Sequence, residues 1–198
     1  MYLIPVQQPA MEQIRAYFEK TVKLSDQDWQ IFSSKLTRQA FPKRHVLLKA
    51  GQTENHLSFV EKGTVRYFIP KVETELTFAF VFENEFVSAY DSFLTKTPCT
   101  YQLEMLSDTV LWRLRYNDLQ AIYNETDIGN TIGRLAGEDL FLKKSKRELS
   151  LLNDSAEQRY LNLFIERPDL LRRIPLKFIA SYIGITPQAL SRIRKRIY

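Results

Sequence analysis

The segment that constrains this chain most is its C-terminal stretch, Leu170–Tyr198, which holds seven basic side chains and no acidic one. Its pattern predicts two short helices joined by a tight turn at Gly184, because glycine reaches positive φ without a Cβ penalty. Thr186 is a favourable N-cap for the second helix, and Pro187 beside it needs no N–H donor there. The apolar side chains expected between the two helices are Ile179, Ile183, Ile185, Leu190 and Ile193.

The outward face of the second predicted helix carries Gln188, Ser191, Arg192 and Lys195. Side chains of these types read base edges in the major groove and hold phosphates. The pattern therefore indicates a helix-turn-helix, with duplex DNA as the partner. The alternative is an ordinary helical hairpin with a basic, solvated face. The turn residue, the cap, the apolar register and the one-sided charge all agree, which favours the helix-turn-helix.

The basic excess belongs to the C-terminal part of the chain alone. The 198 residues together have a net charge of +5, and residues 153–198 hold nine Lys and Arg against four Asp and Glu. The preceding residues are therefore neutral overall. A chain of this length fits one or two domains with a real core. The charge pattern thus indicates a neutral domain joined to one that binds nucleic acid.

The sequence shows no signature of a metal site, an iron–sulfur cluster or a haem group. Cys99 is the single cysteine, which excludes an intrachain disulfide and a cluster held by four cysteines. His45 and His56 are the only histidines and are expected to be structural, although haem ligation by a His/Cys pair stays open. Nucleotide P-loop, nucleophile-elbow and His-Glu-x-x-His patterns are absent. We therefore expect a protein that is not an enzyme.

The sequence also gives no sign of a membrane partner. No apolar run approaches the ~20 residues that span a bilayer. The N-terminal residues lack the basic region and the cleavage site of a secretory signal. We therefore expect a cytoplasmic protein.

The first part of the chain predicts helices followed by short strands. Helical spacing covers Met11–Phe18, and Ser25 is placed to cap a second helix. Further along, short apolar runs punctuated by glycines are typical of strands. Apolar residues alternate most clearly in residues 76–82, 99–105 and 110–114. Strands this short at this spacing predict a small antiparallel barrel or a sandwich of two sheets.

A long helix is expected from about Thr126 to Leu152, with an apolar seam that suits contact with a partner subunit. The seam residues are Ile128, Ile132, Leu135, Leu142 and Leu149. Gly129, Gly133 and Gly137 repeat every four residues at its start. They indicate either a flat face for close approach of another element or a frayed start, with the stable helix beginning near Leu135.

The next helix is expected to run from Ala156 to Ile165, because Ser155 and Gln158 form a capping box. The following proline ends it, and a loop leads to Pro175, which starts the helix-turn-helix. The domain boundary is placed near Asn153–Asp154.

The order of sheet domain, long helix and helix-turn-helix resembles the Crp/Fnr family of bacterial transcription regulators over nearly the whole chain. The likeness is strongest in Ile174–Lys195, which looks like the short members found in Bacteroidetes-type bacteria. Val46–Gly51 and Leu57–Gly63 look like the first turns of the cyclic-nucleotide-binding barrel.

The resemblance implies an α+β fold in three parts. These are an N-terminal antiparallel β-barrel of the double-stranded β-helix or jelly-roll type with flanking helices (residues 1–124), a long dimerisation helix (125–152) and a C-terminal helix-turn-helix domain (153–198). It further implies a homodimer on an inverted-repeat operator in double-stranded DNA, and contact with RNA polymerase. The family's recognition helix is usually followed by a β-hairpin wing. Because the sequence ends at Tyr198, wing contacts are expected to be missing.

Matching to the family also implies roles for individual residues. Arg192 is expected to read guanine and Gln188 adenine, with Ser191 beside them. The residues expected to contact phosphates, which position the protein without specifying sequence, are Thr186, Lys177, Arg194, Lys195 and Arg196.

The family's phosphate-binding cassette is degraded in this chain. Ser88–Ala89 stands where nucleotide-binding members have Gly-Glu, and Cys99–Tyr101 stands where they have the arginine that pairs with the cyclic phosphate. Without that cation, cyclic AMP is not expected to bind in the usual way. The candidate pocket for another, unknown effector is formed by Ser88, Ala89, Tyr90, Cys99, Thr100 and Tyr101. The alternative is that the aromatic side chains in this region simply fill the barrel.

The leading hypothesis is a dimeric, sequence-specific DNA-binding transcription regulator with a sensor barrel. One alternative is a ligand-sensing barrel that acts through protein–protein contacts, with the C-terminal helices as the docking surface. The other is a non-specific architectural DNA binder.

Overall fold

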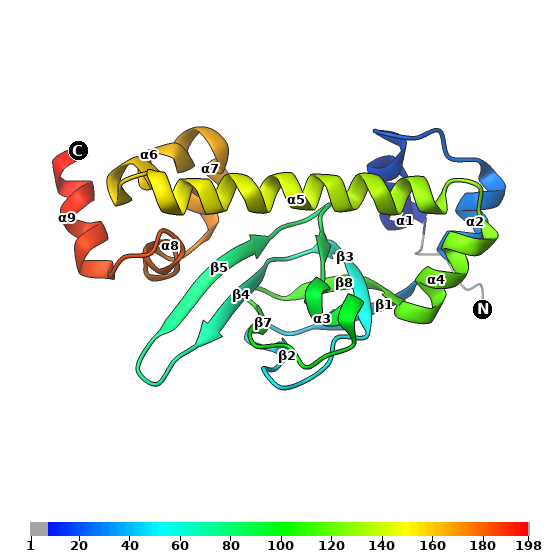
Figure 1. The fold of residues 1–198 in the computed structure, drawn as a ribbon, viewed down its shortest axis with the longest axis horizontal. Coiled ribbons are helices and arrows are strands. Elements are labelled where there is room, and N and C mark those ends of the chain that lie inside the picture. Colours follow the sequence, from blue (N-terminus) through cyan, green and yellow to red (C-terminus); the bar gives the residue numbers. More distant parts are fainter. Residues whose placement is uncertain (1–7, 198) are drawn as a thin grey trace, which may run out of the picture. The chain divides into compact units, whose positions relative to one another are not determined.

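The computed structural model describes residues 8–197, which form two units by their internal contacts (Figure 1). The first unit comprises the described part of Met1–Tyr67 together with Phe80–Gly137. The second comprises Phe68–Ala79 together with the described part of Glu138–Tyr198. The expected lack of a secretory signal concerns the N-terminal residues, of which 1–7 lie outside the described part. No helix within the described part combines the length and the apolar character of a membrane span.

Two helices open the first unit, in line with the sequence pattern. α1 spans Gln8–Glu19 and α2 spans Asp26–Ser34. On α1, Ile14 and Phe18 lie four residues apart, so both point to one face, and both are buried. α2 begins where the Ser25 hydroxyl accepts a hydrogen bond from a backbone N–H of the first turn at 3.0 Å. This bond confirms Ser25 as the N-cap.

Two antiparallel sheets of four strands each follow. The first sheet has the order β1 (Thr37–Phe41), β8 (Thr109–Arg115), β3 (His56–Lys62) and β6 (Phe86–Val87). The second has the order β2 (Val46–Leu48), β7 (Gln102–Met105), β4 (Val65–Pro70) and β5 (Glu75–Val81). Strands of the two sheets interleave along the chain, as in the jelly roll that the resemblance implies.

The prediction of a closed barrel was wrong, because each sheet keeps two edges. The edge strands are β1 and β6 in one sheet and β2 and β5 in the other. Closure requires edge strands to pair with each other, and β6 and β2 contain only two and three residues. β1 carries mostly exposed side chains, so it lacks the apolar alternation by which a strand is found in a sequence.

The core of the first unit is rich in aromatic side chains. It joins α1, α2, α3 (Tyr90–Thr95) and α4 (Tyr116–Glu125) to strands β3 and β8, so the flanking helices were predicted correctly. Its buried members are Ile14, Phe18, Phe32, Phe59, Phe93, Trp112, Leu114, Leu119 and Ile122. Phe18 and Phe32 meet edge-to-face with their ring centroids 5.1 Å apart, a favoured aromatic geometry.

The long helix α5 spans Gly129–Asn153, so it begins before Leu135 and the interpretation of a frayed start was wrong. Gly129 and Gly133 are points of close approach. A Cβ on Gly129 would lie 2.6 Å from a backbone oxygen of α4, and one on Gly133 would lie 2.9 Å from a tyrosine hydroxyl of α4. At Gly137 a Cβ would meet no atom within 4 Å. The first two glycines therefore let α4 and α5 pack closely.

After α5, the described part of the second unit is helical. Its helices after α5 are α6 (Ala156–Glu166), α7 (Pro168–Arg173), α8 (Leu176–Tyr182) and α9 (Pro187–Ile197). The Ser155 hydroxyl accepts the Gln158 N–H at 3.1 Å, which confirms the predicted cap of α6. The segment expected to be a loop is α7. Pro168 takes its first position, where a missing N–H costs nothing, and Leu170 is fully buried.

Candidate nucleic-acid interface and effector pocket

A tight turn joins α8 to α9 at the glycine that the sequence pattern indicates. Gly184 has φ +80°, in the left-handed region that glycine adopts without strain. Its N–H donates to the Ser181 carbonyl at 3.1 Å, and the Ile185 N–H donates to the Ala180 carbonyl at 3.0 Å. This pair of bonds is the Schellman pattern, which satisfies the last carbonyls of a helix while the chain reverses.

Apolar packing and a cap fix the course of α9. Of the five side chains predicted to lie between the helices, Ile185 is half-buried and four are buried: Ile179, Ile183, Leu190 and Ile193. The Thr186 hydroxyl accepts the Ala189 N–H at 3.2 Å, so Thr186 caps the helix as predicted. Burial of one face of α9 leaves the opposite face to solvent.

The solvent face of α9 carries the predicted DNA-reading residues. Gln188, Ser191, Arg192 and Lys195 are all exposed, and helical spacing places them on one side. Basic residues in the last turn of α9 also complement the negative end of its dipole. That structural role accounts for Lys195, but not for Arg192 or Gln188, which lie nearer the N-terminus of the helix.

The other side chains predicted to contact phosphates differ in their exposure to solvent and in their ion pairs. Lys177 is exposed on α8, with its ammonium 4.7 Å from the centre of the Phe178 ring. Arg194 is half-buried and therefore less accessible. Arg196 pairs with Glu157 of α6 at 2.7 Å, and both side chains are largely exposed. An exposed ion pair contributes about 0–1 kcal/mol, so it competes only weakly with a phosphate.

A groove of about 510 Å³ borders this face, between α9 and the start of α6. Its lining residues are Ala156, Ile185, Ala189, Arg192, Ile193, Lys195 and Arg196. The sequence pattern did not reveal it, because Ala156 is some thirty residues from α9 and is brought there only by the packing of the helices. The groove combines apolar lining with three cations, so it suits an anionic partner.

The region predicted to hold an effector is occupied by its own side chains. The Tyr67 hydroxyl accepts the Ser88 N–H at 2.9 Å and donates to the Ser88 carbonyl at 3.0 Å. The Ser88 hydroxyl donates to the His56 carbonyl at 2.9 Å. Burial raises the pKa of Tyr67 above its ordinary value, so the phenol is neutral. The backbone N–H and carbonyl of Ser88 are therefore bonded to Tyr67, and Ala89 is buried.

The second half of the predicted pocket is also internally bonded. The Cys99 thiol donates to the Tyr101 carbonyl at 3.1 Å, and burial raises the pKa of that thiol, which keeps it unreactive. The Tyr101 hydroxyl donates to the Asp91 carboxylate. Tyr90 is half-buried and Thr100 is exposed. Of these residues, Thr100 is the one most open to solvent.

A cyclic phosphate does not fit this set of residues. Such a group needs backbone N–H donors and a cation, whereas the Ser88 N–H is taken by Tyr67 and the charged group beside Tyr101 is a carboxylate. Arg66 of β4 is buried and pairs with Glu104 at 3.0 Å. These contacts support the interpretation that aromatic side chains fill the interior of the sheets.

The two histidines show no sign of a ligand role. Burial lowers the pKa of His56 to about 4, so its imidazole is neutral at pH 7. His45 lies against the Phe41 ring, with the centroids 5.0 Å apart. Across residues 8–197, no three His, Cys, Asp or Glu side chains gather as candidate metal ligands.

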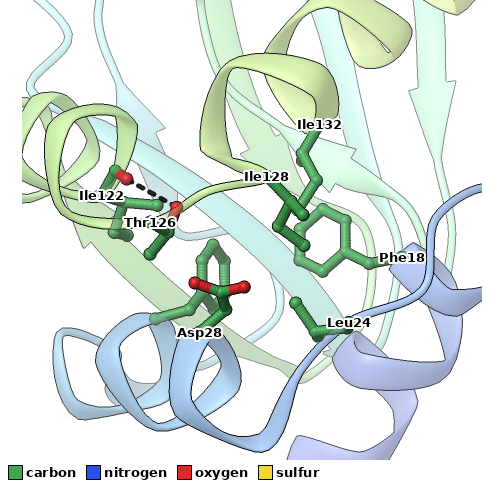
Figure 2. Close-up of a pocket in the computed structure, with 8 residues that line it drawn as sticks. Phe18, Leu24, Asp28, Ile122, Thr126, Ile128 and Ile132 are labelled. Atoms are coloured by element: carbon green, nitrogen blue, oxygen red, sulfur yellow. Dashed lines mark hydrogen bonds between the residues drawn. The ribbon is translucent and has the colours of Figure 1, made fainter.

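A small cavity lies among α1, α2, α4 and the start of α5 (Figure 2). Its lining residues are Phe18, Leu24, Asp28, Phe32, Ile122, Thr126, Ile128 and Ile132. The Thr126 hydroxyl donates to the Ile122 carbonyl at 2.7 Å across one side of it. The volume of about 10 Å³ admits no more than about one water molecule. The cavity is therefore too small for an effector.

The predicted dimerisation seam of α5 divides into an internal and an external part. Ile128 and Ile132 line the small cavity, so these two residues pack within the first unit, and Leu135 is half-buried. Leu142 and Leu149 are 65% and 55% exposed. The exposed apolar side chains of the second half of α5 are Phe141, Leu142, Leu149, Leu151 and Leu152.

Comparison with known proteins shows a family match over the sheet domain and similar folds among solved structures. Residues 38–126 match the family described as the cyclic nucleotide-binding domain. A protein from Eubacterium rectale described as a Crp/Fnr-family transcriptional regulator matches with a TM-score of 0.70 and 17% identity, over 92% of this chain and 87% of that one. FixK2 from Bradyrhizobium japonicum matches with a TM-score of 0.69 and 14% identity, over 82% and 84%.

A third structure, the c-di-GMP-responsive global regulator CLP of Xanthomonas campestris, has a TM-score of 0.66 and 17% identity, over 87% of this chain and 91% of that one. Likeness at this level of identity shows the fold. Curated protein sequences give no match. The chain is thus an α+β protein whose residues 38–126 are similar to the cyclic nucleotide-binding domain, and its fold is similar to that of a structure described as a Crp/Fnr-family regulator.

Proposed function

We propose that the protein is a dimeric, sequence-specific DNA-binding transcription regulator without catalytic activity. The observation that carries the proposal is the solvent face of α9, where Gln188, Ser191, Arg192 and Lys195 stand together. This helix follows a glycine turn and packs on α8, the geometry by which a helix-turn-helix presents its recognition helix. The similar folds of Crp/Fnr-type regulators support the same role.

Within the proposal, the residues of α9 divide into two groups. Arg192 has a guanidinium that can donate two bonds to guanine, and Gln188 has an amide that matches adenine, with Ser191 between them. The phosphate contacts are assigned to Thr186, Lys177, Lys195, Arg196 and, with less access, Arg194. We also propose RNA polymerase as a partner, and this part of the proposal rests only on the resemblance to the Crp/Fnr family.

The proposed dimer uses the exposed part of the α5 seam. Leu142 and Leu149 lie seven residues apart, the spacing of a helix-pairing stripe, and both are exposed. Ile128 and Ile132 contribute less because they pack within their own unit, and Leu135 contributes less because it is half-buried. A twofold dimer would place two recognition helices about 34–36 Å apart, and it would therefore read an inverted repeat.

The sheet domain is proposed not to bind cyclic AMP in the usual way. The Tyr67 hydroxyl accepts the backbone N–H of Ser88, and the Asp91 carboxylate accepts the hydroxyl of Tyr101. An effector for this domain would therefore need to displace Tyr67 or bind elsewhere. Its chemical identity is not specified by these residues.

Two alternatives are distinguished from the proposal by the strength of duplex binding and by the preference for one site. The groove beside α9 contains apolar residues, which favours a protein partner for the C-terminal helices. Such a partner would leave duplex affinity weak and non-specific. An architectural DNA binder would bind all duplexes with the salt dependence of counterion release but would prefer no site.

The test compares Arg192→Ala with Lys195→Ala in duplex titrations over a range of salt concentrations. Lys195→Ala should weaken binding to all sequences alike and lower the slope of log affinity against log salt by about 1. Arg192→Ala should reduce the preference for the best site more than the affinity for a mixed-sequence duplex. Equal loss on all sequences for Arg192→Ala would contradict its base-reading role.

A further inference from the structure

A serine of α8 pairs with the backbone of an edge strand within the second unit. The Ser181 hydroxyl accepts the Thr77 N–H at 2.8 Å and donates to the Glu75 carbonyl at 2.7 Å. Residues 75 and 77 lie two apart on β5, so these groups point to the same side of the strand. β5 is an edge of its sheet. The serine hydroxyl therefore takes the place of a neighbouring strand at this point.

An arginine of α5 joins the same two elements. The Arg147 Nε donates to the Phe78 carbonyl of β5 at 3.1 Å, and its Nη2 donates to the Tyr182 carbonyl at the end of α8. The guanidinium also lies 3.6 Å from the centre of the Tyr182 ring. Burial lowers the pKa of Arg147, but an arginine stays charged. Its half-buried charge is thus stabilised by two carbonyl oxygens and an aromatic face.

A second arginine also donates hydrogen bonds to the end of α8. Arg159 of α6 donates from Nε to the Ile183 carbonyl at 2.9 Å and from Nη1 to the Asp154 carbonyl at 2.5 Å. Cations at a helix C-terminus are favourable because the last carbonyls lack partners within the helix. The end of α8, immediately before the turn into α9, is therefore bonded to α5, α6 and β5.

We propose that Ser181 and Arg147 are positioning residues that hold the α8–α9 pair against β5 in the arrangement that binds DNA. The inference rests on the proposed function of α9. The contacts leave the face with Gln188 and Arg192 exposed, so they are compatible with DNA binding. β5 continues at Phe80 into the first unit, so the strand that Ser181 and Arg147 contact is continuous with the sheet domain. A protein whose binding arrangement is pre-formed loses less affinity to reorganisation.

The contact is tested by hydrogen exchange in the full-length protein. Ser181→Ala removes the acceptor of the Thr77 N–H, so exchange at Thr77 should accelerate on the order of tenfold. Ser181→Thr keeps a hydroxyl and should retain most of the protection. Ser34→Ala, which removes a hydroxyl that donates to the Ile31 carbonyl within α2, is the matched control and should leave exchange at Thr77 unchanged.

The role in DNA binding is tested with the same variants on a duplex enriched by the wild-type protein. Ser181→Ala and Arg147→Lys should each weaken binding on the order of tenfold, with the salt slope unchanged because no phosphate contact is lost. Ser34→Ala should bind like the wild type. A changed salt slope would instead identify a direct phosphate contact and overturn the positioning role.

The outcomes separate this inference from the function on which it rests. Unchanged exchange at Thr77 in Ser181→Ala would overturn the contact itself. Faster exchange with unchanged duplex affinity would overturn its role in DNA binding. A wild-type protein that selects no duplex would refute the proposed function, and with it any effect of Ser181 on DNA, while exchange at Thr77 would still show whether the contact forms.

Discussion

The turn between α8 and α9 gives the most quantitative prediction, the cost of Gly184→Ala. Gly184 has φ +80°, and a Cβ built there would meet only the Arg159 Nη2, at 3.8 Å, an ordinary van der Waals distance. The cost is therefore the left-handed backbone alone, about 1–2 kcal/mol in the free energy of unfolding. Urea unfolding followed by far-ultraviolet circular dichroism measures it.

Two other glycines with positive φ give reference values for the stability cost of Gly184→Ala. Gly51 has φ +86°, and a Cβ there would meet no atom within 4 Å, so Gly51→Ala should cost about the same as Gly184→Ala. Gly63 has φ +109°, and its Cβ would lie 2.4 Å from the Thr109 Oγ1 and 2.8 Å from the Thr109 Cα, so Gly63→Ala should cost clearly more. A Gly184→Ala protein as stable as the wild type, or as unstable as Gly63→Ala, would refute the reasoning.

Four further expectations concern the helices and the sheet domain. Gly137→Ala should stabilise the protein by about 1 kcal/mol in urea unfolding, since its Cβ meets nothing within 4 Å in a helix interior; a loss of stability would contradict this. Tyr67→Phe should destabilise by about 1–3 kcal/mol, because it leaves the buried Ser88 N–H without its partner; an unchanged urea midpoint would show that the bond contributes nothing. The folded pKa of His56, about 4, lies below the ordinary 6.5, so the unfolded chain binds the extra proton and stability falls as pH decreases through that range. His56→Asn should flatten this fall in urea midpoints between pH 6.5 and 4, and identical pH profiles would refute the assignment. Leu142→Glu should weaken self-association in sedimentation equilibrium, because Leu142 is 65% exposed on the proposed dimer face; undiminished association would exclude this face.

Local signals were sufficient to predict α6, α8 and α9, whereas α7 was expected to be a loop. Ser155 and Thr186 cap the helices that follow them, and Gly184 has the positive φ that its place between two apolar helices indicated. Capping and turn formation depend on residues within a few positions of each other. Such features are therefore visible in a sequence before any tertiary contact is known.

Features that depend on distant contacts could not be predicted in the same way. β1 is stabilised by pairing with β8, some seventy residues away, although its own side chains are mostly exposed. Tyr67 closes the predicted pocket through the backbone of Ser88, and Ser181 completes the edge of β5. A tyrosine in a strand and a serine in a helix carry no local sign of these partners. The sheets stay open because their edge strands do not pair with each other, and such pairing between distant strands is not visible in the local sequence.

Selection of bound duplexes from a random library, with no added ligand and near-physiological salt, tests the central claim most directly. The account predicts an enriched inverted repeat with half-site centres about one helical turn apart, since two copies of α9 would read successive major grooves. Arg192→Ala in the same selection should lose the enrichment. Binding of all duplexes without enrichment, by the wild-type protein with or without cell extract, would contradict sequence-specific recognition and support an architectural role.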